Sequence, residues 1–148
     1  MQFYVWAGYA LTGLAITAPL TAAAQPAVAT DSAVFVERQR NDARRSLEPA
    51  TRLAPGDRVV TIVNWYRMGG DGGFTITNPL PRTIAYQGSA RDDQEVSVDG
   101  GRTWGRLGEL RIAGRLATPE DVTHMRWRVP AHSAARGQGR IAYSGIVR

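Results

Sequence analysis

EVSVDGGRTW, residues 95–104, is the stretch that determines the fold class expected for this chain. Its two valines alternate with polar neighbours, which is typical of a half-buried β-strand. The DGG triplet at residues 99–101 follows, and such Asp-Gly and Gly-Gly pairs supply the positive φ angles that a tight hairpin turn needs. Thr103 and Trp104 begin the returning strand. The stretch therefore predicts a β-hairpin with the Trp104 ring folded over it.

Outward from this hairpin, short apolar runs with a period of two alternate with turn signals rich in Gly, Pro and Asp. The strongest run, residues 58–68, is apolar on both sides, which predicts a central strand covered at least in part on both faces. The other expected strands are residues 33–39, 74–78, 83–88, 107–112, 122–129 and 139–147. Residues 40–53 and 131–138 are expected to be loops. About seven to nine short strands without a helical period predict an all-β, antiparallel sandwich.

The beginning of the chain has the pattern of a secretory signal peptide. Residues 1–24 carry no charged side chain, residues 5–20 are mostly apolar, and three alanines at 22–24 offer an A-x-A cleavage site. No Lys or Arg precedes the apolar run, and the alternative is a transmembrane anchor; the run is short and interrupted by Gly, Thr and Pro. We expect cleavage after Ala24, no stable membrane insertion afterwards, and a periplasmic, extracellular or cell-surface location. Residues 25–32 would be a flexible mature terminus, and residues 33–148 one sandwich domain.

Composition narrows the class of protein further. The chain has 18 basic residues, all of them Arg, against 13 acidic residues, for a net charge of +5. The arginines are spread from Arg38 to Arg148 rather than clustered, so nucleic acid is not an expected partner. There is no Cys, which excludes disulfides and Cys-ligated zinc.

Five residues of the opening stretch match a known hairpin motif. Ser97, Asp99, Gly101, Thr103 and Trp104 fit S-x-D-x-G-x-T-W, which resembles the Asp-box. In proteins that carry this motif the Asp carboxylate ties the turn backbone and the aromatic ring packs on the hairpin. Sialidases carry several Asp-boxes on a much longer six-bladed propeller, and a chain of this size with one copy cannot form one. These five residues are therefore expected to be a structural hairpin, not part of a sialidase-like site.

A wider resemblance covers residues 34–148. The motifs VFVER, LAPGD, TNPLP, IAYQGSA, SVDGGRTWG, VTHMRWRV and GRIAYSGIVR occur in that order. This order resembles the bacterial "conserved repeat domain" family, domain of unknown function eleven. The resemblance implies export, often to the cell surface, an immunoglobulin-like sandwich fold and a structural or adhesive role, with no catalytic residues to carry over. Longer members repeat the domain, whereas this chain contains one copy.

The first expected strand leaves two alternatives open. A segment around Val34, Phe35 and Val36 is separated from the next strand by a loop of about fourteen residues. It can pair within its own domain, or it can be donated to a neighbouring subunit and build a head-to-tail filament. Pairing within its own domain is favoured because a long polar loop closes easily.

No arrangement of reactive side chains stands out, so no catalytic, cofactor-binding or metal-binding residue is expected. His124 and His132 are the only histidines and lack metal-ligand spacing. The acidic residues Asp92, Asp93, Glu95, Glu120 and Asp121 are expected to be solvated rather than to bind Ca²⁺ or act as a carboxylate pair.

The function expected is that of an exported, non-catalytic structural, adhesive or assembly protein of the bacterial envelope. It would contact other protein subunits or surface proteins through sheet edges or loops. The alternative is a carbohydrate- or ligand-binding module that uses exposed aromatic rings and arginines, and a glycosidase-related fragment comes last. In the segment Arg126-Trp127-Arg128 the ring is expected in the core and both arginines in solvent.

Overall fold

The structure, a computed structural model, describes residues 27–39 and 44–148. The predicted signal peptide at residues 1–24 lies outside the described residues. The described part of the chain is mostly β, with 53% of its residues in strands and 8% in helices, and its strands form antiparallel sheets. The prediction of an all-β sandwich is therefore confirmed.

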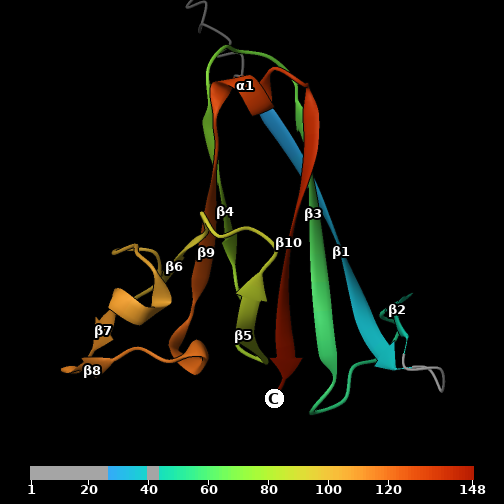
Figure 1. The fold of residues 1–148 in the computed structure, drawn as a ribbon, viewed down its shortest axis with the longest axis vertical. Helices are drawn as coiled ribbons and strands as arrows, with labels where there is room; N and C mark the ends of the chain where they lie inside the picture. The colour runs from blue at the N-terminus through green and yellow to red at the C-terminus, as the bar shows by residue number, and fades with distance from the viewer. Residues whose placement is uncertain (1–26, 40–43) are drawn as a thin grey trace, which may run out of the picture.

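The larger sheet has five strands in the order β2-β1-β3-β10-β5 (Figure 1). All four pairings within it are antiparallel. The strands are β1 (Val28–Gln39), β2 (Arg45–Pro49), β3 (Arg58–Arg67), β5 (Ile84–Ser89) and β10 (Gln138–Val147). β3 is the middle strand of this sheet, and it pairs with the long strands β1 and β10 on either side.

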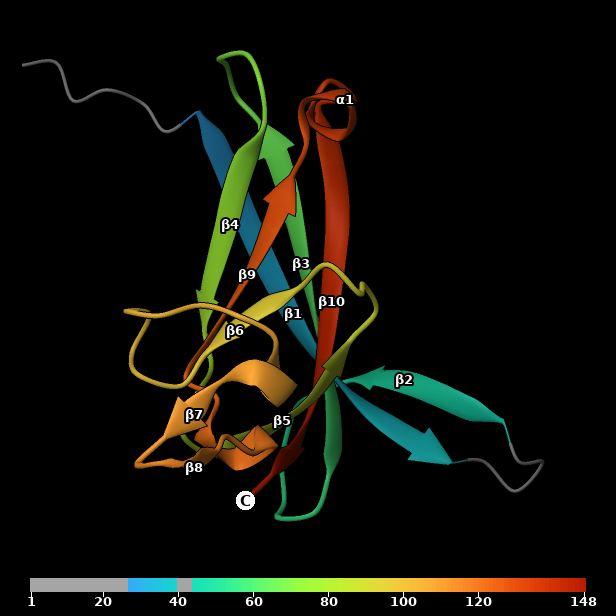
Figure 2. The ribbon, with the colours of Figure 1, turned by 60° about the vertical axis from the view of Figure 1, so that its left-hand side comes forward.

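The smaller sheet has three strands in the order β4-β9-β6 and faces β3 and β10 (Figure 2). Its strands are β4 (Phe74–Pro79), β9 (His124–Val129) and β6 (Glu95–Ser97). A separate two-stranded hairpin and three short helices lie in the connections: β7 (Arg111–Ile112), β8 (Arg115–Leu116), η1 (Leu107–Glu109), η2 (Pro119–Asp121) and α1 (Ala131–Ala134).

The core lies between the two sheets. Met125 and Trp127 on β9 are fully buried, and the Trp127 ring lies 6.0 Å from the ring of Tyr143 on β10. Trp65 on β3 meets Phe74 on β4 edge to face at 5.2 Å. Each such side chain contributes roughly 1.5–3 kcal/mol through burial, so these rings are the main stabilising contacts between the sheets.

The other face of β3 differs from the expectation of cover on both sides. Val60, Ile62 and Asn64 alternate with the buried residues of the strand and are half-buried. Among the described residues no element packs over this outer face (Figure 1). The apolar residues on both sides of β3 therefore mark a strand with one core face and one open face.

The first strand begins earlier than predicted. β1 starts at Val28 rather than at residue 33, so residues 28–32 are not a flexible terminus. They pair with the last residues of β3, from Val28 opposite Arg67 to Ser32 opposite Val63. Backbone hydrogen bonds to a neighbouring strand do not require apolar side chains, so the weak apolar pattern of this segment concealed a strand.

Three connections also differ from prediction. Residues 45–49, expected in a loop, form β2, which pairs with the last part of β1 and projects with it as an arm (Figure 2). Residues 107–112, expected as a strand, form η1 and then the two-residue β7, and residues 131–134 form α1. Residues 27–39 and 44–148 contain ten strands, where about seven to nine were expected, because short exposed strands carry little apolar periodicity.

Candidate functional site

The turn after β6 is organised by one carboxylate. Asp99 Oδ1 accepts hydrogen bonds from the backbone N–H groups of Arg102 at 3.0 Å and Thr103 at 2.9 Å, and from the Ser97 hydroxyl at 2.8 Å. Asp99 Oδ2 accepts a further bond from the Thr103 hydroxyl at 2.7 Å. The bonds from Thr103, followed by the bond from Ser97, hold the pKa of Asp99 far below its usual range. Both oxygens of the carboxylate thus accept hydrogen bonds from groups within the turn itself.

The same turn is attached to the middle strand of the smaller sheet. The hydroxyl of Ser97, which is fully buried, accepts the N–H of Gly101 at 2.8 Å. The hydroxyl of Thr123 accepts the N–H of Gly100 at 3.1 Å and donates to the carbonyl of Ser97 at 3.1 Å. Both glycines have positive φ, 79° and 87°, as a hairpin turn of this kind needs. The five motif residues therefore form one rigid, hydrogen-bonded unit.

Trp104 lies on this unit, and most of its ring is in contact with protein. Its indole N–H donates to the carbonyl of Gly101 at 2.9 Å, and His124 meets the ring edge to face at 6.5 Å. The guanidinium of Arg126 lies over the ring at 4.6 Å and is itself held by Glu95 at 2.7 Å. That ion pair lowers the pKa of Glu95. Trp104 is thus a packed residue of the hairpin rather than a bare platform for a ligand.

The expectation for the segment Arg126-Trp127-Arg128 is corrected at one residue. Trp127 is in the core and the Arg128 side chain is 70% exposed, as expected. Arg126 is only 24% exposed, because it lies between Trp104 and Glu95 instead of in solvent. Two residues far apart in the sequence meet through the pairing of β6 with β9, which sequence spacing does not reveal.

The titratable groups do not gather into a reactive constellation. Within residues 27–39 and 44–148, no three His, Asp or Glu side chains converge so that they could hold a metal ion. Asp93 pairs with Arg91 at 2.5 Å, while Asp121 caps η2 and binds Arg115 through two bonds of 2.7 and 2.8 Å. His132 lies on the surface in α1.

A hollow beside Trp104 is the polar candidate site. It encloses about 440 Å³ and is lined by Trp104, Arg106, Arg128, Glu109 and the buried Gln94. The Gln94 carbonyl accepts the hydroxyl of Tyr86 at 2.6 Å, and burial raises the pKa of that phenol. Both charge signs are present in the wall, so the hollow fits a polar, neutral or zwitterionic molecule better than a strong anion.

The apolar candidate site is a groove at the open side of the sandwich. It encloses about 300 Å³ between β1 and the loop after β4. Val34 and Leu53, which line it, are 40% and 45% exposed, although Val34 points to the same side of the sheet as the buried Thr61 opposite it. The other wall is made by Pro79 and Pro81.

The groove exists because the two sheets differ in width. Five strands face three, and β4 is the last strand of the smaller sheet, so no described strand covers the inward side of β1. Thr30, Ser32 and Val34 on that side are exposed, whereas Val36 further along the strand is buried. The sequence did not predict the groove, because the groove depends on which strands face each other. The TNPLP run that ends β4 indicates one wall of the groove, but it does not indicate that the inward side of β1 is uncovered.

The segment considered as a strand donor pairs within its own domain. Val34, Phe35 and Val36 lie opposite Thr61, Val60 and Val59 of β3. Phe35 and Val36 also pair with β2, so this part of β1 has neighbours on both sides.

Comparisons with protein-family models, with curated proteins and with solved structures found no match. The resemblance to the conserved repeat domain stays a prediction. Among the described helices, none is both long and apolar enough to cross a bilayer.

Proposed function

We propose that this chain is an exported, non-catalytic assembly or adhesion protein of a bacterial envelope, which binds an extended segment of another protein along the free edge of β4. The observation that supports this is the groove beside β4, where Val34 and Leu53 are exposed next to an unpaired strand edge. An added strand would take the place that the narrower sheet leaves empty.

The chemistry of β4 is suited to accept a strand. Exposed sheet edges are usually protected by charged side chains, bulges or prolines within the strand. β4 reads FTITNP, without a charged residue and with a proline only at its end. A strand added here would gain main-chain hydrogen bonds from β4, and its alternate side chains would enter the groove. The expected ligand is therefore an extended segment with small or medium apolar side chains at every second position.

Two predictions support export: the signal peptide at residues 1–24 and the resemblance of residues 34–148 to exported domains. Partners are then other subunits or proteins of the cell surface.

The test is assembly of the purified protein with and without a blocked groove. The wild type is expected to form concentration-dependent multimers larger than a dimer, seen by sedimentation velocity and as filaments by electron microscopy. Val34→Glu places a charge in the groove, where a buried unpaired charge costs several kcal/mol. Thr77→Lys places on the exposed face of the edge strand the kind of charge that protects sheet edges from pairing. Each change should weaken assembly by at least about tenfold. Met68→Lys, at an exposed apolar residue elsewhere, is the control and should assemble normally.

A partner other than a second copy requires one further measurement. A photo-crosslinking residue at Val34 in producing cells should join the chain to one envelope protein, and Thr77→Lys should abolish that product. If the wild type forms nothing larger than a dimer and Val34 yields no such product, the groove does not bind a protein segment.

The hollow beside Trp104 supports a second candidate, binding of a glycan or another small polar ligand. An aromatic ring, two arginines and a buried amide in one wall are groups that sugars contact. A glycan array should give a hit that Trp104→Ala removes while circular dichroism stays unchanged. A hit that survives this change would not come from this hollow, and hydrolysis of any array sugar would contradict the non-catalytic proposal.

A further inference from the structure

The outer face of the five-stranded sheet has an apolar centre. The antiparallel register sets side chains in rows across β1, β3 and β10. One row is Ala33, Ile62 and Ala142, and the next is Phe35, Val60 and Ser144. Ile62, Val60 and Phe35 are half-buried by their neighbours, and no described element lies over them. The outer face of an antiparallel sandwich is normally polar, so an apolar centre on it indicates a contact surface.

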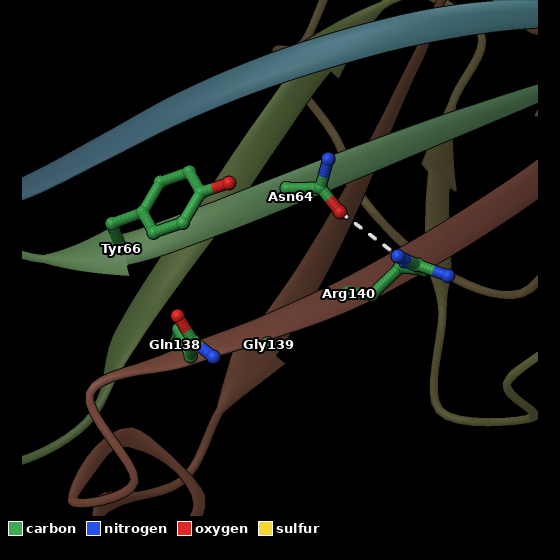
Figure 3. Close-up of a pocket in the computed structure, with 5 residues that line it drawn as sticks. All are labelled: Asn64, Tyr66, Gln138, Gly139 and Arg140. Carbon is green, nitrogen blue, oxygen red and sulfur yellow. Dashed lines mark hydrogen bonds between the residues drawn. The ribbon is translucent and has the colours of Figure 1, made fainter.

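A polar row borders this centre at one end. Asn64 on β3 donates to Asp31 on β1 at 2.8 Å and accepts from Arg140 on β10 at 3.2 Å. Figure 3 shows the side chains of Asn64 and Arg140, with Tyr66 and Gln138, rising from the same side of the two strands. The row places a negative charge on one flank of β3 and a positive charge on the other flank at the same height.

This arrangement is complementary to itself under one symmetry operation. A two-fold axis parallel to β3 exchanges the β1 flank of one copy with the β10 flank of the other. Asp31 of each copy then faces Arg140 of the other copy, which gives two such contacts. Ile62 of one copy lies on Ile62 of the other. In the next row the large Phe35 meets the small Ser144. A two-fold axis across the strands through Ile62 would instead place Asp31 on Phe35, which buries a charge without a partner.

The size of the face is adequate for such a contact. Ten residues of β3 at about 3.4 Å per residue, and four strands at about 4.8 Å spacing, give a face of roughly 600 Å². Two such faces bury roughly 1,200 Å² in total, the lower bound for a specific interface. Aligned sheets stack about 10 Å apart and within about 30° of each other, so the rows stay in register near the centre.

We infer that the outer face of the five-stranded sheet is the interface of a homodimer, in which two copies stack these sheets back to back about a two-fold axis parallel to β3. The dimer uses a surface on the opposite side of the sheet from the groove, so it does not depend on the proposed binding of a strand at β4.

Charge reversal tests both the interface and its axis. The changes are made in the Val34→Glu protein, in which the proposed groove contact is blocked. In sedimentation velocity and native mass spectrometry that protein should be a dimer. Asp31→Arg sets two arginines against each other at both contacts, and Arg140→Asp does the same with two carboxylates. Each single change should weaken dimerisation at least about tenfold, since like charges across an interface cost several kcal/mol.

Recombination of the two changes gives the decisive result. An equimolar mixture of the Asp31→Arg and Arg140→Asp proteins should form a heterodimer, because each contact then joins an arginine to an aspartate. The double variant should regain the homodimer. Only an axis that brings β1 over β10 predicts both outcomes. Arg136→Asp, on an exposed residue after α1, is the control and should leave the dimer intact.

Three outcomes would overturn the inference: a Val34→Glu protein that stays monomeric at about 100 µM, charge-reversal variants that dimerise as that protein does, or a mixture that does not recover. Ile62→Lys, with an unchanged circular dichroism spectrum, should also give monomers. Val34→Glu should leave the dimer intact, so a failure of the groove proposal and a failure of the dimer are separable.

Discussion

At the scale of single residues, Asp99 shows how one side chain determines a turn. Its two oxygens accept bonds from the Arg102 and Thr103 backbone and from the hydroxyls of Ser97 and Thr103. Bonds to the ionised form stabilise it, which is why its pKa is strongly lowered. Ser97, Arg102 and Thr103 are therefore linked through a single carboxylate.

That charge makes the stability of the hairpin depend on pH. The pKa of an unfolded Asp is about 3.9, and that of the native carboxylate is lower. The contribution of Asp99 to the free energy of unfolding is therefore fully present above about pH 5 and is lost as the pH falls. Thermal unfolding from pH 7 to pH 3 should show a falling melting temperature in the acid range. Asp99→Asn should be less stable at pH 7 and less sensitive to acid.

Part of the acid sensitivity should remain in that variant, because Asp121 also has a strongly lowered pKa, chiefly through its bonds with Arg115. Asp71→Asn, in an exposed loop, is the matched control and should keep the wild-type pH dependence. Equal pH dependence in Asp99→Asn and the wild type would contradict the role given to this carboxylate.

At the scale of the strands, two glycines of β10 make room for large side chains of the neighbouring strands β3 and β5. Gly139 lies opposite Trp65 on β3, and a Cβ added there would overlap Cζ2 of the indole. Gly145, at the bulge where β10 pairs with β5, is similarly close to Ile84. These two glycines allow large core side chains to lie flat on the strand.

Gly139→Ala should therefore destabilise the domain by about 1–3 kcal/mol, the usual cost of overpacking a core. Urea unfolding followed by tryptophan fluorescence measures this change. Gly88→Ala in β5 is the control, because an added Cβ there meets no atom within 4 Å. If both variants unfold at the same urea concentration, the Trp65 side chain moves aside without loss of stability, and the prediction is wrong.

At the scale of the whole molecule, β1 is a structural member of the larger sheet rather than a detachable arm. Nine of its residues pair with β3 from Val28 to Val36, and its last five pair with β2. Removal of β1 would expose the unpaired edge of β3 and open the core beside Val59 and Val63.

A chain that lacks residues 25–40 should therefore fail to fold, with loss of the β-type circular dichroism signal and of a cooperative melt. A chain that begins at residue 27 keeps all of β1 and should melt like the chain that begins at residue 25. A stable, folded monomer without residues 25–40 would instead show that β1 is dispensable, as a donated strand would be.

The sequence by itself determined the fold class and most of the strands. Alternation of apolar with polar or small residues located β4, β5, β9 and β10, and a longer apolar run located β3, which buries one face although both of its faces are apolar. The spacing from Ser97 to Trp104 specified the residues of the turn because every bond within it is local.

Only the tertiary structure decided the partners of these elements. It placed Arg126 on Trp104, left the inward side of β1 uncovered beside β4, and aligned Asp31 and Arg140 on either side of Asn64. Local periodicity indicates which side of a strand is buried, whereas strand order and sheet width determine which residues lie against that side. Strand order and sheet width depend on contacts between residues distant in the chain, and so do the groove beside β4 and the proposed dimer face.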